Sequence, residues 1–255
     1  MLHAIDHLVI VVPDLAAAIK TYRDLGFTVV AGGRHTGVGT DNALIAFRDA
    51  SYLELVGFYE PRPDHRWWTP LQQGGGLVDF CLQTDDLAGD AAILRRAGVD
   101  MGNLEPRHRL RPDGVEVRWV CALARGEHRG VAPFVLAEET GRDERVPGQR
   151  VHANGVTGVG LVTVAVHDLA AVRGWYEQAL GVRGTDVASP ELGATGVRFP
   201  IGPHIFEFLA ATGAGAVRDW LARRGASPYA ATLVGAPRPI PLDLGRTWGA
   251  RLALA

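Results

Sequence analysis

The stretch HLVIVVPDLAAAIKTYRDLGFTV at residues 7–29 contains the pattern that decides the fold. An apolar run is followed by Asp14, then by apolar and aromatic residues at helical spacing, and then by Gly26. Aspartate is a good N-cap residue, and glycine readily adopts the left-handed backbone at which a helix commonly ends. The stretch therefore predicts a strand that leads directly into a helix.

The same pattern returns further along the chain. It stands at 77–100 as LVDFCLQTDDLAGDAAILRRAGVD and at 161–182 as LVTVAVHDLAAVRGWYEQALGV. A weaker fourth copy, ASPYAATLVG, lies at 226–235. Self-similarity of this kind indicates a fold built from copies of one structural unit.

After the strand and helix comes a stretch in which residues alternate between the two faces of a strand. ALIAFRDASYLELVGF at 43–58 predicts a hairpin that places Leu53 and Leu55 on one face and Glu54 on the other. GVRFPIGPHIFEFLAA at 196–211 has the same layout. The repeated unit is therefore a βαβββ module.

These modules predict an α+β fold. We expect two modules in an N-terminal domain at 1–140, and a degenerate pair in a smaller second domain at 155–255. The segment between them, 141–154, is charged and carries Pro147. It shows neither helical nor strand periodicity, so it is the predicted linker.

Composition excludes several classes of protein. The chain has 255 residues, 47% of them hydrophobic, and a formal net charge of -2, which favours a globular protein without a nucleic-acid or membrane partner. The N-terminus has no basic segment or cleavage site typical of a signal peptide, so we expect a cytoplasmic protein. Cys81 and Cys121 are expected to be reduced core thiols. Motifs typical of hydrolases, nucleoside triphosphatases and zinc proteases are absent.

The paired modules, with IDHLVIVVPDL as a first strand and YLELVG as a last strand, resemble the vicinal oxygen chelate superfamily. This superfamily includes glyoxalase I, bleomycin-resistance proteins and extradiol dioxygenases. The segments GGGLVDFCLQTDDL and RPDGVEVRW are similar to those of glyoxalase-like domain proteins. The resemblance implies that the modules form half-barrel cups and that residues 1–140 are a glyoxalase-like domain. It also implies a divalent metal in the cup, bound at inward-pointing strand residues.

Carried over residue by residue, the resemblance implies His7, Glu54 and Asp79 as metal ligands, with Glu54 also the candidate catalytic carboxylate. Such a set suits Mn, Fe, Ni or Zn. Alternation supports an inward Asp79, because Val78 and Phe80 would form the opposite, apolar face. In the alternative interpretation the three polar groups contact one another in a metal-free cup.

Three positions depart from the pattern of the superfamily. Phe134 or Val135 stands where the fourth ligand, a glutamate, is expected. In the second domain Leu161 replaces the histidine and Ala230 stands at the position of Asp79, so that only Glu207 is left. Any chemistry is therefore expected in the first domain, with the second covering or bracing it.

Three further residues are candidate substrate-binding residues. Trp67, in the loop RPDHRWWTPLQQGGG, would form a wall of the cup or, alternatively, seal the edge of the sheets. Arg111 and Arg118, in RHRLRPDGVEVRW, would hold a carboxylate or phosphate if they face the cup, and would be solvated if they face outward.

Two functions follow from the sequence. The first is a metal-assisted lyase, isomerase or dioxygenase that acts on a small oxygen-rich molecule. The second is a metal-free binding or resistance protein of the bleomycin-resistance type. In both cases the partner is a small-molecule ligand, and a homodimer is an additional expectation.

Overall fold

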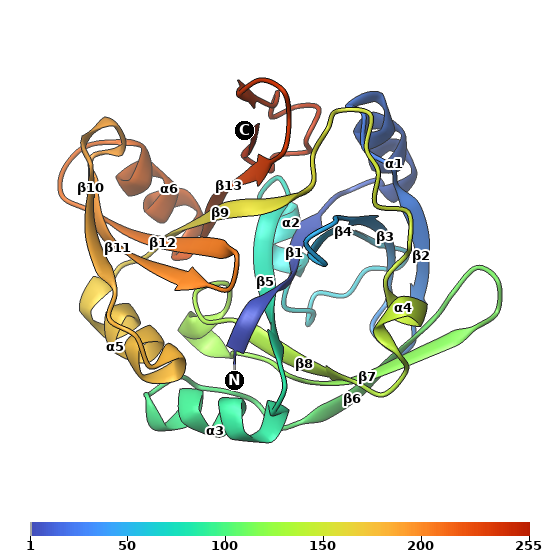
Figure 1. The fold of residues 1–255 in the computed structure, drawn as a ribbon, viewed down its shortest axis with the longest axis horizontal. Coiled ribbons are helices and arrows are strands. Elements are labelled where there is room, and N and C mark those ends of the chain that lie inside the picture. The colour runs from blue at the N-terminus through green and yellow to red at the C-terminus, as the bar shows by residue number, and fades with distance from the viewer. Residues whose placement is uncertain (1) are drawn as a thin grey trace.

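The chain forms two curved sheets that lie side by side (Figure 1). The computed structural model describes residues 2–255. The first half is a closed barrel of strand order β1-β4-β3-β2-β6-β7-β8-β5, and the second half is a 7-stranded sheet of order β10-β11-β12-β9-β13-β15-β14. The predicted α+β fold of βαβββ cups is confirmed.

The barrel consists of two modules. The first contains β1 (Leu2–Val11), α1 (Leu15–Asp24), β2 (Val30–His35), β3 (Thr40–Ala46) and β4 (Tyr52–Phe58). A loop with the short helix α2 (Trp68–Gln72) leads to the second, which contains β5 (Gly76–Thr84), α3 (Leu87–Arg96), β6 (Glu105–Leu110), β7 (Glu116–Ala122) and β8 (Phe134–Glu138).

The second sheet follows α4 (Arg142–Arg145). Its elements are β9 (Gly158–Ala165), α5 (Leu169–Leu180), β10 (Thr185–Ser189), β11 (Ala194–Ile201), β12 (His204–Ala211), α6 (Ala216–Arg224), β13 (Ser227–Val234), β14 (Ile240–Pro241) and β15 (Leu252–Leu254). The fourth repeat has kept its first strand, β13, which pairs antiparallel with β9 as β5 pairs with β1. Without a full set of further strands, this sheet stays open.

The predicted helix signals are present in the structure. The Asp14 side chain accepts a hydrogen bond from the backbone N–H of Ala17, and Asp86 and Asp168 cap α3 and α5 in the same way. Gly26 follows α1 with φ +86°, in the left-handed region that favours glycine. Each module therefore turns from strand to helix and back where its sequence indicates.

Register shifts between β1 and β5 modify the strand alternation, and two of the three lie beside site residues. The register between β1 and β5 shifts between Ile5 and His7, and again between Val9 and Ile10. The second shift moves Val78 into the apolar cluster inside the barrel, whereas Phe80 packs in the core outside it. The expectation that Val78 and Phe80 share a face is wrong because a bulge adds a residue to one strand and reverses the alternation.

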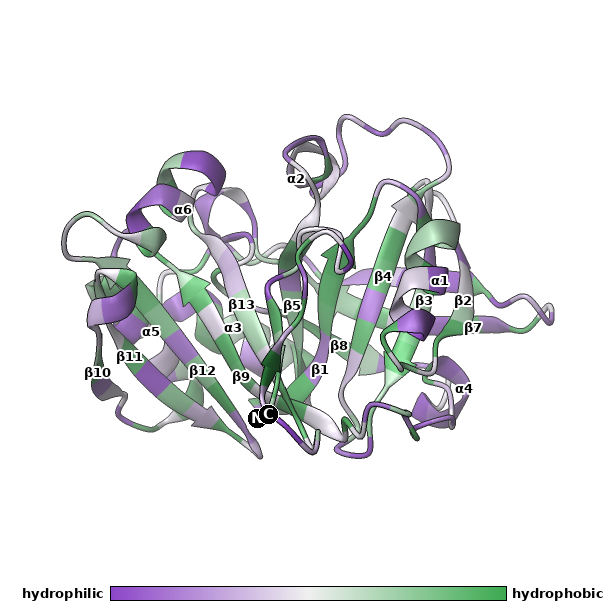
Figure 2. Cartoon of the chain, turned by 90° about the horizontal axis from the view of Figure 1, so that it is seen from above, coloured by the Kyte–Doolittle hydropathy of each residue, from purple (hydrophilic) through white to green (hydrophobic). Residues whose placement is uncertain are grey.

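The two sheets pack against each other through apolar side chains. Figure 2 shows hydrophobic residues concentrated on strands such as β1, β5 and β8, whereas α4 is hydrophilic. The rings of Phe80 and Phe206 lie 4.9 Å apart between the barrel and the second sheet, and both side chains are fully buried. The Tyr176 hydroxyl on α5 donates a hydrogen bond to the carbonyl of Val131 at 2.9 Å. Core residues of both sheets thus form one continuous cluster.

A second connection lies at the glycine run before β5. Arg224 of α6 donates hydrogen bonds to the carbonyls of Gln73 at 3.0 Å and Gly75 at 2.8 Å. Gly76 has φ +89°, and a Cβ there would lie 2.6 Å from the carbonyl oxygen of Gly249. The end of the run, Gly75 and Gly76, is therefore a packed joint that leaves no room for a side chain.

We expect Phe80→Ala to lower the free energy of unfolding by about 3–5 kcal/mol, because it leaves a cavity where the two sheets meet. Urea denaturation followed by circular dichroism measures this. Ile205→Ala, at a side chain that is 43% exposed, is the control and should change stability by less than about 0.5 kcal/mol. A loss below about 1 kcal/mol for Phe80→Ala would contradict this packing of the two sheets.

Candidate functional site

The barrel contains a cavity of about 290 Å³. Its lining combines cationic, imidazole and aromatic side chains. They include His7, His35, Tyr52, Glu54, Arg62, Asp64, His65, Arg66, Trp67, Arg107, Arg109, Trp119, Cys121, Phe134, Leu136 and Arg145.

His7 and Glu54 meet at this cavity. The Nε2 atom of His7 lies 3.4 Å from Oε2 of Glu54, and both side chains are buried. The imidazole stacks on Tyr52 with ring centroids 4.6 Å apart, and Phe134 lies edge-on to it at 5.2 Å. The parallel pairing of β1 with β4 places His7 and Glu54 on adjacent strands. Two of the three predicted metal ligands are therefore close together.

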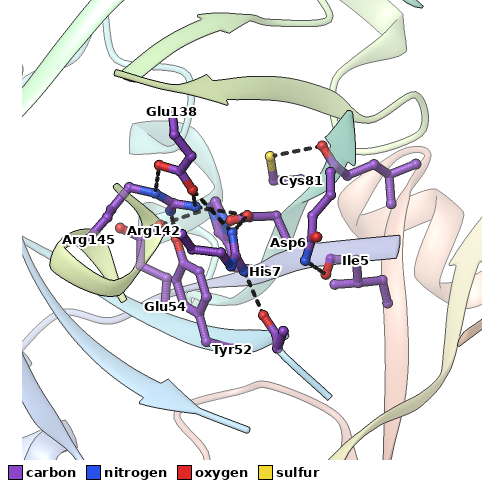
Figure 3. Close-up of polar contacts among 12 residues, drawn as sticks. Ile5, Asp6, His7, Tyr52, Glu54, Cys81, Glu138, Arg142 and Arg145 are labelled. Atoms are coloured by element: carbon purple, nitrogen blue, oxygen red, sulfur yellow. Dashed lines mark hydrogen bonds and ion pairs between the residues drawn. The ribbon is translucent and has the colours of Figure 1, made fainter. Parts of the chain in front are cut away.

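Asp6 is part of this site, although no role was predicted for it from the sequence. Its Oδ1 lies 2.6 Å from Nδ1 of His7, while its Oδ2 pairs with Arg142 and, at 2.8 Å, with Arg145 (Figure 3). Simple alternation would place Asp6 and His7 on opposite faces, but the bulge beside His7 removes that constraint. Only the Asp-His pair itself could have indicated this contact in the sequence.

The ionisation of these groups follows from their partners. Burial alone would raise the pKa of Asp6, but Arg145 and the hydrogen bond from His7 hold it well below its usual range. Burial alone would lower the pKa of His7, but the carboxylates of Asp6 and Glu54 raise it. Burial opposes ionisation of Glu54 as well, yet its bond with His7 brings its pKa to about 2. The two carboxylates on either side of His7 thus favour its protonated form.

Asp79 lies apart from this pair. Its Oδ2 accepts a hydrogen bond from the indole N–H of Trp67 at 2.9 Å and lies 2.7 Å from Nη2 of Arg66. Among residues 2–255, the only group of three potential ligand atoms within 4.8 Å of one another is Asp6, His7 and Cys81. The predicted set of His7, Glu54 and Asp79 does not form such a group.

Neither set of residues fits a divalent cation as it lies here. A metal requires a neutral imidazole and deprotonated ligands, whereas both nitrogens of His7 face carboxylates. Burial raises the pKa of the Cys81 thiol well above its usual value, and Asp6 is already paired with two arginines. The arrangement is that of a charge-paired network.

Five arginines line the cavity, and four of them have carboxylate partners. These pairs are Arg62 with Glu60, Arg66 with Asp79, Arg107 with Glu105, and Arg145 with Asp6 and Glu138. Arg109 is the exception, because no carboxylate of the described chain lies within 4.0 Å of it. It is 3% exposed, and its Nε has no hydrogen-bond partner in residues 2–255.

Neutral groups hold the rest of Arg109. Its Nη2 donates a hydrogen bond to the carbonyl of Arg145 at 2.8 Å, and its Nη1 donates to Oδ1 of Asn42 at 3.3 Å. The Asn42 amide in turn donates to Oε1 of Glu54 at 2.5 Å. Arg109 is therefore fixed in position with its charge largely uncompensated.

The two arginines that the sequence made candidates lie elsewhere. Arg111 follows the end of β6 and pairs with Asp113 and Glu144, while Arg118 points outward from β7 and pairs with Glu116. Neither residue lines the cavity. The alternating arginines of β6 that do face inward are Arg107 and Arg109. Arg111 does not continue the series because the strand ends before it. The predicted roles of Arg111 and Arg118 stay predictions.

The loop between the two modules covers the cavity with His65, Arg66 and Trp67. His65 accepts a hydrogen bond from the backbone N–H of Trp67 at 3.2 Å and lies edge-on to Phe58 at 5.0 Å. Burial lowers the pKa of His65 to about 4, and also that of His35. Both line the cavity as neutral imidazoles. The sequence did not reveal them because they stand in polar stretches without ligand spacing.

The second sheet has no equivalent group of polar residues at the positions compared. Leu161 and Ala230 stand on β9 and β13, and Glu207 pairs with Arg198 at 2.6 Å. Glu207 is thus neutralised on a sheet that does not close into a barrel.

A model of the glyoxalase-like domain family matches residues 5–214. This is most of the chain, and it extends from the barrel into the second sheet. The chain therefore belongs to the glyoxalase-like domain family, and the resemblance to the vicinal oxygen chelate superfamily is confirmed. No curated protein matches the chain by sequence.

Solved structures share this fold. A hypothetical protein from Staphylococcus aureus has a TM-score of 0.72 and 14% identity, with 98% of each chain covered. A mutant of 4-hydroxymandelate synthase from Streptomyces coelicolor has a TM-score of 0.64 and 15% identity over 98% of this chain and 75% of that one. A xylose isomerase-like TIM barrel/4-hydroxyphenylpyruvate dioxygenase fusion protein has a TM-score of 0.52 and 15% identity over 97% and 37%. At these identities the likeness shows the fold alone.

Acid should destabilise the cover of the cavity through His65. The folded chain binds a proton there only near pH 4, whereas the unfolded chain does so near 6.5, so this contribution is complete above pH 6.5 and declines as the pH falls. We expect His65→Gln to reduce the slope of unfolding free energy against pH in this window by up to about 1.4 kcal/mol per pH unit. Urea denaturation at several pH values measures the slope. An NMR titration that places the pKa of His65 at 6 or above would contradict the prediction.

Proposed function

We propose that the N-terminal barrel binds a small organic molecule with a carboxylate, phosphate or similar anionic oxygen group, and does so without a metal. The observation that carries the proposal is Arg109, a buried guanidinium at the cavity with no carboxylate partner in the described chain. An anionic group of a ligand would supply the missing charge. A guanidinium offers this group two parallel N–H donors in a planar fork.

The energetics of burial support this proposal. Desolvating an unpaired charge is costly, and folded proteins pair buried charges for that reason. Every other arginine at the cavity has a partner, so Arg109 is the position at which a ligand gains most. Burial also lowers the pKa of Arg109, which is the signature of a cation that its surroundings leave undercompensated.

The remaining walls support an organic ligand over a simple inorganic ion. Trp67, Trp119, Phe134 and Leu136 supply aromatic and aliphatic surface. Such surface stabilises a ligand by removing apolar area from water, while a few polar groups fix its orientation. The cavity of about 290 Å³ has room for a molecule with one ring and a charged substituent.

The second candidate function is the metal-assisted enzyme implied by the superfamily. It is favoured by one observation, the pair of His7 and Glu54 at the cavity. These two residues would have to exchange their mutual contact for a cation, and module two offers Phe134 where a further carboxylate is expected. Glu54, with a pKa of about 2, is also a weak proton acceptor near neutral pH. We therefore rank this function below metal-free binding.

Arg109→Met tests the proposal. We expect isothermal titration calorimetry to show that phenyl phosphate or benzoate binds the unmodified protein, and that the variant binds at least about tenfold more weakly, because hydrogen bonds to charged groups contribute about 1.5–3 kcal/mol. Neutral phenol should bind both proteins equally. The melting temperature of the variant should stay the same or rise, since an uncompensated buried charge is removed.

Arg96→Met, at an exposed position at the end of α3, is the matched control and should bind like the unmodified protein. Failure of the unmodified protein to bind any tested carboxylate or phosphate at millimolar concentration would overturn the proposal. Equal binding by Arg109→Met would overturn the role of Arg109.

The two candidate functions differ in their response to divalent ions. We expect no uptake of Mn²⁺, Ni²⁺ or Zn²⁺ at the cavity in calorimetric titrations, and the same result for Glu54→Gln. Uptake that is present in the unmodified protein and lost in both His7→Ala and Glu54→Gln would instead establish the metal-assisted candidate.

A further inference from the structure

Asp79 occupies the position at which the superfamily carries a metal ligand, but its contacts are with the loop that covers the cavity. Both its partners, Arg66 and Trp67, come from this loop, and both line the cavity. The carboxylate is 1% exposed and belongs to β5, in the wall of the barrel. A buried charge on a rigid strand is thus linked to two adjacent residues of the cover.

The contacts of Asp79 set how these two side chains face the cavity. The indole N–H of Trp67 donates a hydrogen bond to Oδ2 of Asp79, and the Arg66 guanidinium lies beside this same oxygen. The other oxygen, Oδ1, accepts a hydrogen bond from the backbone N–H of Phe80 at 3.1 Å, which fixes the carboxylate itself. The indole of Trp67 is therefore held through its N–H, and the residue lines the cavity.

Arg66 is only partly satisfied by this contact. Its Nε and Nη2 are buried and form no well-aligned hydrogen bond with residues 2–255, although Nη2 lies 2.7 Å from Asp79. Its guanidinium stands 6.0 Å above the ring of Phe134. Arg66 is thus held in place by charge while it lines the cavity.

The far end of the same loop is fixed by the second sheet. Arg224 holds the carbonyls of Gln73 and Gly75, and the close contact of Gly76 with Gly249 completes the joint. Between the end of β4 and this joint, Asp79 is the buried charge of the barrel wall that contacts the loop. The Trp67 and Arg66 side chains therefore share one carboxylate as their polar anchor in the barrel wall.

We infer that Asp79 is a positioning residue that anchors the cover of the ligand cavity and presents Arg66 and Trp67 to the ligand. The position that holds a metal in the superfamily serves here to hold a loop. This role in binding rests on the proposed function, but the anchoring of Trp67 does not, and the two are tested separately.

Asp79→Asn tests the anchor in the ligand-free protein. The fluorescence emission of Trp67 is obtained by subtracting the spectrum of a Trp67→Phe variant from that of the protein that keeps Trp67. This subtraction is made twice, once with Asp79 present and once with Asp79→Asn in both proteins. We expect the Asp79→Asn substitution to shift this emission to longer wavelength and to increase its acrylamide quenching at least about twofold, because the indole is released towards water. Asp85→Asn, at an exposed aspartate beyond the end of the same strand, is the control and should change neither.

Phenyl phosphate binding tests the second part. We expect the affinity of Asp79→Asn to fall by roughly tenfold, and the control Asp85→Asn to bind like the unmodified protein. Unchanged Trp67 emission and quenching in Asp79→Asn would overturn the anchor, whether or not the probe binds. A released Trp67 with unchanged affinity would overturn the presentation of the cover to the ligand.

If Asp79→Asn does not fold because Arg66 is left unpaired, Arg66→Met combined with Asp79→Asn removes both charges. The same two readouts apply to this double variant, with Arg66→Met alone for comparison. A Trp67 signal that differs between the two supports the anchor, and identical signals overturn it. Absence of probe binding by the unmodified protein would count against the proposed function only.

Discussion

The structure depends on one constraint, which is that a charge inside a closed barrel needs an opposite charge or a set of hydrogen bonds. Water that would solvate such a group is largely displaced by the walls, so an unpaired ion is costly. Asp6 meets the constraint with two arginines, Glu54 with His7 and Asn42, and Asp79 with a loop. Arg109 is the cavity arginine for which residues 2–255 supply only neutral hydrogen-bond partners, and this difference gives the cavity its chemical character.

The same constraint separates this barrel from a metal centre built on the same fold. A metal site requires carboxylates and imidazoles that are free to turn their lone pairs to a common point. Here, each candidate ligand already has a partner of opposite charge or a donor. Phe134 removes one position altogether, and its ring packs on His7 instead. The fold is retained while the polar contacts within it have been reassigned.

Much of the fold was predictable from the sequence because its signals are local. Asp14, Asp86 and Asp168 mark helix starts through hydrogen bonds that span three residues, and alternation around Glu54 distinguishes the two faces of a strand. The site was less predictable. His7 and Glu54 follow from strand positions, but the contact of Asp6 with His7 depends on a bulge, and the pairing of Asp79 depends on a loop whose path the sequence does not reveal. Arg109 could be assigned to the inward face of β6 only once the end of that strand was known.

The second sheet has lost the residues that would make it a binding cup, yet it contributes to the barrel through the joint formed by Arg224 and the glycines at 75, 76 and 249. Selection on this half of the chain is thereby divided. Substitutions at inner-face positions such as Leu161 and Ala230 would leave the joint in place, whereas substitutions at Arg224 or at the glycines would not. The second sheet thus acts as a buttress for a cavity that it does not line.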